Sequence, residues 1–207
     1  SEEEVYSALH LQYIVPELRE GLAEVSLAKD NRLPELITIE DLKGILHCHS
    51  TYSDGVHSLK EMAGECQRLG YGYFGICDHS RSAGYAQGLS IERVQEQHAE
   101  IDRLNSGYSG FKILKGIESD ILNDGSLDYS DSILSTFDLV IASVHSNLKM
   151  PEEKAMMRLL KAIENPYTTI LGHMTGRLLL SRKGYPVDHK KIIDACAANN
   201  VVIELNA

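Results

Sequence analysis

From Gly44 onward, short apolar runs alternate with longer amphipathic stretches, and this alternation constrains the fold more than any other feature of the sequence. Such a pattern is typical of repeated βα units around a parallel sheet or barrel. The apolar runs that we interpret as strands cover residues 45–49, 73–77, 113–117, 139–143, 169–171 and 201–205. The sequence therefore predicts an α/β fold over residues 44–207.

The amphipathic stretches carry recognisable helix ends. Ser58 followed by Glu61 predicts a capping box, and Gly70 is suited to the position just past the end of that helix. Apolar residues at helical spacing predict further helices over 90–105 and 188–199. These helices separate the expected strands, as βα units require.

Residues 1–43 have a different sequence pattern. They mix charged residues with Pro16 and Pro34 and show no clear alternation of strands and helices. We interpret them as an N-terminal extension or linker. The length of 207 residues is enough for one sizeable core with such an extension.

Composition narrows the classes of function. The formal charge of −10 argues against a free-standing nucleic-acid-binding module, which usually has a clustered basic face. That argument is weak for a metal enzyme, since each divalent ion adds positive charge at the site. No apolar run approaches the roughly 20 residues that span a bilayer, and the first residues are acidic, so we expect a soluble cytoplasmic protein without a membrane partner.

The cysteines do not form a metal-binding or redox motif. Cys48, Cys66, Cys77 and Cys196 lie far apart without a C-x-x-C pair, which excludes a zinc knuckle and a thioredoxin-like motif. They read as reduced thiols. A cysteine nucleophile paired with a neighbouring histidine is the weaker alternative, because strand alternation points Cys48 away from His47 and His49.

Possible metal ligands follow the expected strands. His47 and His49 are two residues apart, so they can face one ion from the same side of a strand. Each later strand except the last also ends at or just before such a residue, and the full set is His47, His49, Asp54, His79, Glu118, His145 and His173. The C-terminal ends of parallel barrel strands share one rim, where these side chains would converge.

The donor types indicate the metal. Imidazole and carboxylate groups suit zinc, manganese or iron, and Glu118 can bridge two ions. A single histidine after a strand is more often a hydrogen-bonded loop residue, but an ordered series of five is not explained that way. Asp54 could instead cap its own Ser-Asp-Gly turn. The remaining histidines lie in the extension, in a turn or on helices and read as structural: His10, His57, His98 and His189.

Other hydrolase and nucleotide-binding classes lack their motifs. The sequence has no G-x-S-x-G elbow, no Walker A loop and no G-x-G-x-x-G, which disfavours serine hydrolases, nucleotide kinases and Rossmann enzymes.

The ordered motifs resemble those of the PHP (polymerase and histidinol phosphatase) domain. The matching runs are LHCHSTYSDG (46–55), ICDHS (76–80), GIE (116–118), SVHS (143–146) and LGH (171–173). A narrower resemblance, to the PHP region at the C-terminus of bacterial family X DNA polymerases, rests on YIVPELRE (13–20), LPELI (33–37), GIESDI with DGSLD (116–128) and GHMTGRLL (172–179).

This resemblance implies a distorted (βα)7 TIM-like barrel holding two to three divalent ions. His47, His49 and Glu118 would bind the first ion, Glu118, His145 and His173 the second, and Asp54 and His79 the third. The family completes its site with an Asp-x-His motif after the last strand, which this sequence does not contain. We therefore expect residues 44–207 to be a C-terminally incomplete PHP domain lacking its last strand, and residues 1–43 to be a linker from a preceding polymerase domain.

The expected activity is hydrolysis of a phosphate ester by metal-activated water, with Glu118 and His145 at its centre. Arg177 would clamp phosphate through its guanidinium, and Arg81 and Lys149 could play similar parts, the alternative being ordinary surface charges. The resemblance implies DNA 3′ ends as substrate, in a 3′→5′ exonuclease or 3′-phosphatase reaction of DNA repair. Alternatives are a stand-alone phosphatase of the histidinol phosphate type and a non-catalytic structural module; the oligomeric state stays open.

Overall fold

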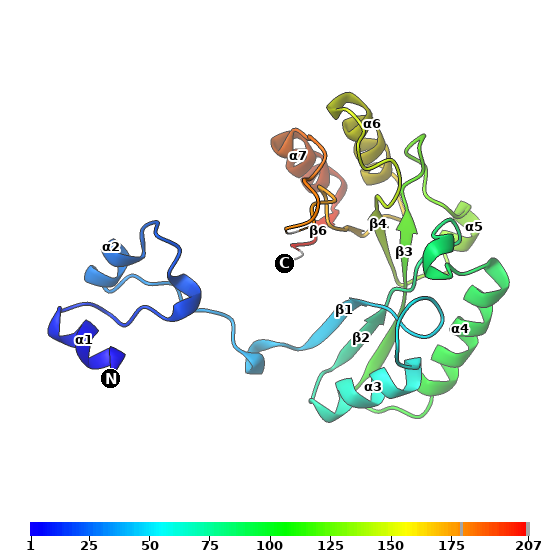
Figure 1. The fold of residues 1–207 in the computed structure, drawn as a ribbon. Helices are drawn as coiled ribbons and strands as arrows, with labels where there is room; N and C mark the ends of the chain where they lie inside the picture. Colours follow the sequence, from blue (N-terminus) through cyan, green and yellow to red (C-terminus); the bar gives the residue numbers. More distant parts are fainter. Residues whose placement is uncertain (179, 206–207) are drawn as a thin grey trace. The chain divides into compact units, whose positions relative to one another are not determined.

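The computed structural model describes residues 1–178 and 180–205, which form two compact units, Ser1–Leu42 and Lys43–Ala207. Leu179 of the GHMTGRLL motif and residues 206–207 lie outside the described residues. Figure 1 shows the course of the chain through both units.

The first unit contains short helices that the sequence analysis did not predict. They are α1 (Glu2–Ala8), η1 (Pro16–Leu18), α2 (Glu24–Lys29) and η2 (Ile39–Asp41). The guanidinium of Arg19 donates to both carboxylate oxygens of Glu2 at 3.0 Å and to the carbonyl of Ile14 at 3.0 Å. Ile14 and Ala28 are buried. Long-range polar contacts of this kind hold helices too short to stand alone.

The second unit is built on one six-stranded parallel sheet with the strands in sequential order (Figure 1). Its strands are β1 (Gly44–Cys48), β2 (Tyr73–Ile76), β3 (Lys112–Asp120), β4 (Leu139–Ser143), β5 (Ile170–Leu171) and β6 (Val202–Ile203). Every neighbouring pair is parallel. The predicted α/β class is therefore confirmed, while closure into seven βα units stays a prediction.

Helices connect the strands and cover the sheet. They are α3 (Leu59–Arg68), η3 (Gly84–Ala86), α4 (Ile91–Asn105), α5 (Asp131–Leu134), α6 (Glu152–Ile163) and α7 (His189–Asn199). The predicted capping box is confirmed, because Ser58 accepts from the backbone N–H of Glu61 and the Glu61 carboxylate accepts in return from the backbone N–H of Ser58. Gly70 adopts a φ of +79°, as its predicted position after the helix requires.

Two apolar clusters fix the sheet against these helices. In one, Phe74 of β2 packs with Leu59 of α3 and Ile101 of α4. In the larger one, Ile117 of β3 packs with Leu159 of α6. All five side chains are nearly inaccessible to solvent. Their burial anchors the strands whose C-terminal ends carry the candidate ligands.

The observed strand limits differ from the predicted ones where tertiary pairing decides. β3 runs to Asp120 rather than ending at residue 117, because residues 116–120 pair in register with β4. Glu118 therefore lies within a strand. β5 and β6 are two residues each, shorter than the predicted 169–171 and 201–205, and only β4 has its predicted limits.

Candidate metal centre

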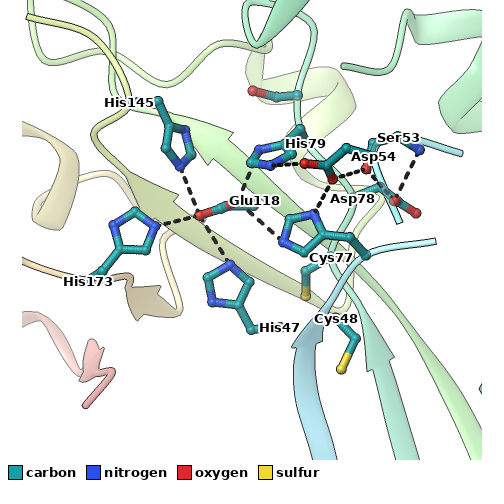
Figure 2. A network of polar contacts seen from close by, with 12 residues as sticks. His47, Cys48, Ser53, Asp54, Cys77, Asp78, His79, Glu118, His145 and His173 are labelled. Carbon is teal, nitrogen blue, oxygen red and sulfur yellow. Dashed lines mark hydrogen bonds and ion pairs between the residues drawn. The ribbon is translucent and has the colours of Figure 1, made fainter. Parts of the chain in front are cut away.

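The centre of the site is the carboxylate of Glu118, which lies on β3 with its side chain 2% exposed. Figure 2 shows imidazoles arranged around it. Oε1 lies 3.1 Å from Nε2 of His47, 3.1 Å from Nε2 of His145 and 2.9 Å from Nε2 of His173. Oε2 lies 3.0 Å from Nδ1 of His79 and 3.6 Å from Nε2 of His49. The two oxygens thus face different sets of histidines.

His47 reaches this carboxylate through a distortion of β1. Its φ is +58°, and the pairing of β1 with β2 shifts register between Ile45 and Cys48, as in a β-bulge. A left-handed conformation costs a non-glycine residue about 1–3 kcal/mol, so the surrounding contacts must hold it. His47 and His49 do face one carboxylate while Cys48 packs against the Phe74 cluster, but a bulge replaces the predicted regular alternation.

Two further carboxylates hold histidine rings in place. Oδ1 of Asp120 lies 2.5 Å from Nδ1 of His145. Glu204 contacts Nδ1 of His47 and accepts the backbone N–H of His173 at 3.0 Å. A carboxylate on Nδ1 fixes the ring orientation and leaves Nε2 directed toward Glu118.

Asp120 and Glu204 are not among the predicted site residues, although the sequence carries a signal for each. Asp120 is two residues beyond Glu118 and so points to the same side of β3. Glu204 directly follows β6, as the other candidate ligands follow their strands. The predicted last strand, 201–205, includes Glu204, so this relation was not evident from the predicted strand limits.

The charges of this cluster are strongly coupled. Burial favours the neutral form of Glu118, but hydrogen bonds from His145, His173 and His47 outweigh it and hold the pKa of this carboxyl well below its usual range. Burial likewise opposes charging of His47 and His145, yet their carboxylate partners raise the pKa of each ring to about 9. The pKa of His79 is lowered, first by burial. Carboxylate–imidazolium pairs therefore hold the metal-free cluster together.

Asp54 approaches the same cluster from the loop after β1. Its Oδ1 lies 3.5 Å from Nδ1 of His49, and its Oδ2 lies 3.6 Å from Nε2 of His79. The turn itself is capped by the buried Asp78, which accepts from the backbone N–H groups of Ser50 and Ser53. Asp78 therefore takes the capping role that was the alternative for Asp54.

A glycine is required in this loop. A Cβ at Gly55 would lie 2.1 Å from the carbonyl oxygen of His49, closer than any backbone atom tolerates. The loop can therefore fold back beside His49 only because residue 55 has no side chain.

The donor atoms fit metal ions. Three groups bring their ligand atoms within 4.8 Å of one another: His47, His49 and Glu118; His49, Asp54 and His79; and His79, Glu118 and His145. Nδ1 of His49 and Nδ1 of His79 are buried and make no hydrogen bond with the described residues, although carboxylate oxygens lie nearby. Such lone pairs are suited to a cation at bond lengths of about 2.0–2.2 Å.

These groups differ in two respects from the expected assignment, because His49 also lies with Asp54 and His79. His79 lies with Glu118 and His145, where the family resemblance implied His173. His173 still contacts Oε1 of Glu118 at 2.9 Å, so it stays a proposed ligand. All seven predicted metal ligands are brought together.

The predicted phosphate-binding residues have different surroundings. Arg177 is exposed and lines a hollow together with His145 and His173. Arg81 is turned toward Asp128, with Nη2 3.5 Å from the carbonyl oxygen. Lys149 lies outside the hollow, as do the four histidines interpreted as structural: His10, His57, His98 and His189.

Comparison with known proteins identifies the family. The PHP domain model matches residues 46–207. The chain belongs to the PHP domain family. Over its whole length it is 46% identical to DNA polymerase/3'-5' exonuclease PolX of Bacillus subtilis (strain 168), of which it spans 36%. It is also 30% identical over 153 residues to a probable phosphatase of Thermoanaerobacter sp. (strain X514), a match that covers 66% of this chain and 60% of that relative.

A solved structure supports the fold of this PHP domain. Histidinol phosphate phosphatase from Lactococcus lactis subsp. lactis Il1403, crystallised with zinc, L-histidinol and phosphate, has a TM-score of 0.55 to this chain. The match covers 79% of this chain and 73% of that chain at 19% identity. The resemblance to the PHP domain and to family X polymerases, predicted from the motifs, is confirmed. Within the described residues, every helix is too short or too polar to cross a membrane.

Proposed function

We propose that this PHP domain is a metal-dependent phosphoesterase with two to three zinc, manganese or iron ions. The observation that carries the proposal is the single buried Glu118 carboxylate facing five histidines, three at Oε1 and two at Oε2. A carboxylate so placed can bridge ions. When bound, such ions lower the pKa of a coordinated water and stabilise charge on phosphate and on the leaving oxygen.

The chain's own residues have separate tasks in this reaction. The histidines and Asp54 bind the ions, while Asp120 and Glu204 keep the rings of His145 and His47 in the orientation that presents Nε2. Arg177 binds nonbridging phosphate oxygens through paired N–H groups. The reaction needs no side-chain nucleophile.

We further propose the 3′ end of DNA as the substrate, in 3′→5′ exonuclease or 3′-phosphatase chemistry. The support is the match to PolX, which is 46% identical and extends over the full length of this chain, residues 1–43 included. Those residues would then link the PHP domain to a polymerase domain in the longer protein. A basic neighbouring domain would supply the DNA-backbone contacts that a chain of charge −10 does not favour.

A small-molecule phosphatase is the second candidate. The probable phosphatase of Thermoanaerobacter and the fold of histidinol phosphate phosphatase favour it. A non-catalytic structural module is the third possibility, and metal content distinguishes it from both enzymes.

The test compares substrates for the full chain supplied with zinc or manganese. One set is a 5′-labelled, 3′-recessed DNA duplex ending in hydroxyl or in phosphate; the other is histidinol phosphate and p-nitrophenyl phosphate. We expect shortening or dephosphorylation of the DNA, lost in His145→Ala and retained in the matched control His189→Ala, whose residue is exposed on α7. Cleavage of the small esters alone would reverse the order of the candidates. Less than one ion per chain, with no hydrolysis, would leave only the structural module.

A further inference from the structure

A second hollow of about 420 Å³ adjoins the metal centre and shares His145 and His173 with it. Its size lies within the range of small-molecule sites. Tyr85 also lines both hollows, and the rest of the second one includes Leu148 and Leu178 together with arginines. A phosphate ion gains no binding energy from such apolar surface. A substrate that fills the hollow must therefore carry a further group next to its phosphate.

Tyr85 supplies an aromatic surface at the border between the two hollows. Its ring centroid lies 5.9 Å from that of His79 and 6.3 Å from that of His145, and the residue is 72% exposed. The surrounding loop is hydrogen-bonded to itself, since Gly88 N–H donates to the Ala83 carbonyl at 3.1 Å and Leu89 N–H to the His79 carbonyl at 2.9 Å. The ring is therefore held beside the metal centre with much of its surface open.

Another part of the wall combines apolar and cationic groups. Leu178 and Arg182 pair through two backbone hydrogen bonds of 2.9 and 2.8 Å, and Nε of Arg182 donates to the Gly176 carbonyl at 3.0 Å. Leu178 is 53% exposed. Among the described residues, the guanidinium groups of Arg177 and Arg182 make no ion pair with a carboxylate. The wall thus offers two cations and an apolar side chain to a ligand.

We infer that this hollow binds a nucleoside esterified to the scissile phosphate. The base stacks on Tyr85 and contacts Leu178, Arg177 binds the scissile phosphate, and Arg182 binds a flanking phosphate of the same strand. Aromatic stacking accepts any base, whereas guanidinium groups select phosphate. An aromatic ring, an apolar side chain and two arginines beside one metal centre match a nucleotide better than an isolated phosphate monoester.

This inference rests on the proposed phosphoesterase function and names its substrate more closely. In the reaction, the oxygen of water bonds to phosphorus while the phosphorus–oxygen bond to the leaving alcohol breaks, and the alcohol takes up a proton. The nucleoside in the hollow stays on the phosphate and leaves as a nucleoside monophosphate.

The test uses two diesters with the same charge and leaving group: thymidine 5′-(p-nitrophenyl phosphate) and methyl p-nitrophenyl phosphate. We expect the full chain with manganese to prefer the thymidine ester. Tyr85→Ala should raise KM for that ester about tenfold and reduce the preference, whereas Tyr85→Phe should keep it, since stacking needs only the ring. Arg182→Ala should weaken binding of the dinucleotide pTpT, and Arg103→Ala, an exposed arginine on α4, should not.

These measurements test the nucleoside site and the phosphoesterase activity separately. An equal preference in wild type and Tyr85→Ala would overturn the nucleoside site while leaving the phosphoesterase intact. Absence of hydrolysis of both diesters, with p-nitrophenyl phosphate also left intact, would refute the phosphoesterase. In that case calorimetric titration with thymidine 5′-monophosphate still tests the hollow, and equal affinity in wild type and Tyr85→Ala would refute it.

Discussion

Asp78 is the residue whose replacement most directly tests how the fold supports the metal centre. Its side chain is fully buried and accepts five hydrogen bonds: from the Ser50 N–H at 2.8 Å and hydroxyl at 2.7 Å, from the Ser53 N–H at 3.2 Å and hydroxyl at 2.5 Å, and from the Gln97 amide at 2.7 Å. These bonds hold the loop that presents Asp54 to His49 and His79. Asp78→Ala should therefore lower both the stability of the protein and its metal content.

The magnitude follows from the donors left behind. The serine hydroxyls can rotate to other partners, but the two backbone N–H groups and the Gln97 amide are left as three unsatisfied donors. At about 1–3 kcal/mol for each buried unsatisfied group, Asp78→Ala should cost at least about 3 kcal/mol. Asp78→Asn should cost only about 1–2 kcal/mol. Its remaining oxygen still accepts from the backbone, and its new N–H₂ can donate to the Ser50 hydroxyl and to Oε1 of Gln97, which is buried without a described partner.

The assay is urea denaturation of the full chain after treatment with a chelator, so that only the fold is measured. Asp102→Ala is the matched control, because Asp102 is 65% exposed and pairs with Lys115, an ion pair worth at most about 1 kcal/mol. A loss of no more than about 2 kcal/mol in Asp78→Ala, the range expected for Asp78→Asn, would refute the reasoning. Equal losses in the alanine and asparagine variants would also refute it, since hydrogen-bond geometry would then not be the cause.

Three further predictions concern the metal centre. Glu118→Gln should reduce the metal content measured by mass spectrometry to less than one ion per chain, because a neutral amide bridges ions poorly; an unchanged content would contradict the bridging role. Asp120→Asn should weaken metal affinity about 10- to 100-fold in competition with a chromogenic chelator, and an unchanged affinity would mean that other contacts orient His145. Because carboxylates raise the pKa of His47 and His145 from 6.5 to about 9 in the metal-free fold, their contribution to stability is complete below pH 6.5 and is lost as the pH rises through 9. Urea titrations of chelated protein should show this fall, and metal binding in that range should release protons, measured by calorimetry in buffers of different ionisation heat; a flat profile with no release would contradict both.

Much of the fold was readable from the sequence because it depends on local signals. The capping box of Ser58 and Glu61 and the helix end at Gly70 obey short-range rules, and β4 is an apolar run that ends at Ser143. The helices of residues 1–42 were not predicted. They are short, and Arg19 stabilises them through residues distant in the chain, which no local pattern reveals.

The candidate ligands were likewise readable, since each follows an apolar run and the rim of a parallel sheet gathers such positions. The supporting carboxylates had weaker signals. Glu204 falls directly after a strand only once β6 is known to end at Ile203, and Asp120 falls within β3 only because pairing with β4 extends that strand. Strand ends depend on the neighbouring strand, so they cannot be set by one segment alone.

Residue types and their spacing were therefore enough to predict the donor chemistry, the order of the βα units and the convergence of five ligands: His47, His49, Glu118, His145 and His173. How they converge depends on packing: a bulge with positive φ turns His47, Oε1 and Oε2 of Glu118 face different histidines, and Tyr85 and Arg182 line one hollow. The reason is physical. Residue type and spacing fix what a side chain can bind, but distances between segments far apart in the chain are set by packing, and chemistry at a metal centre depends on those distances.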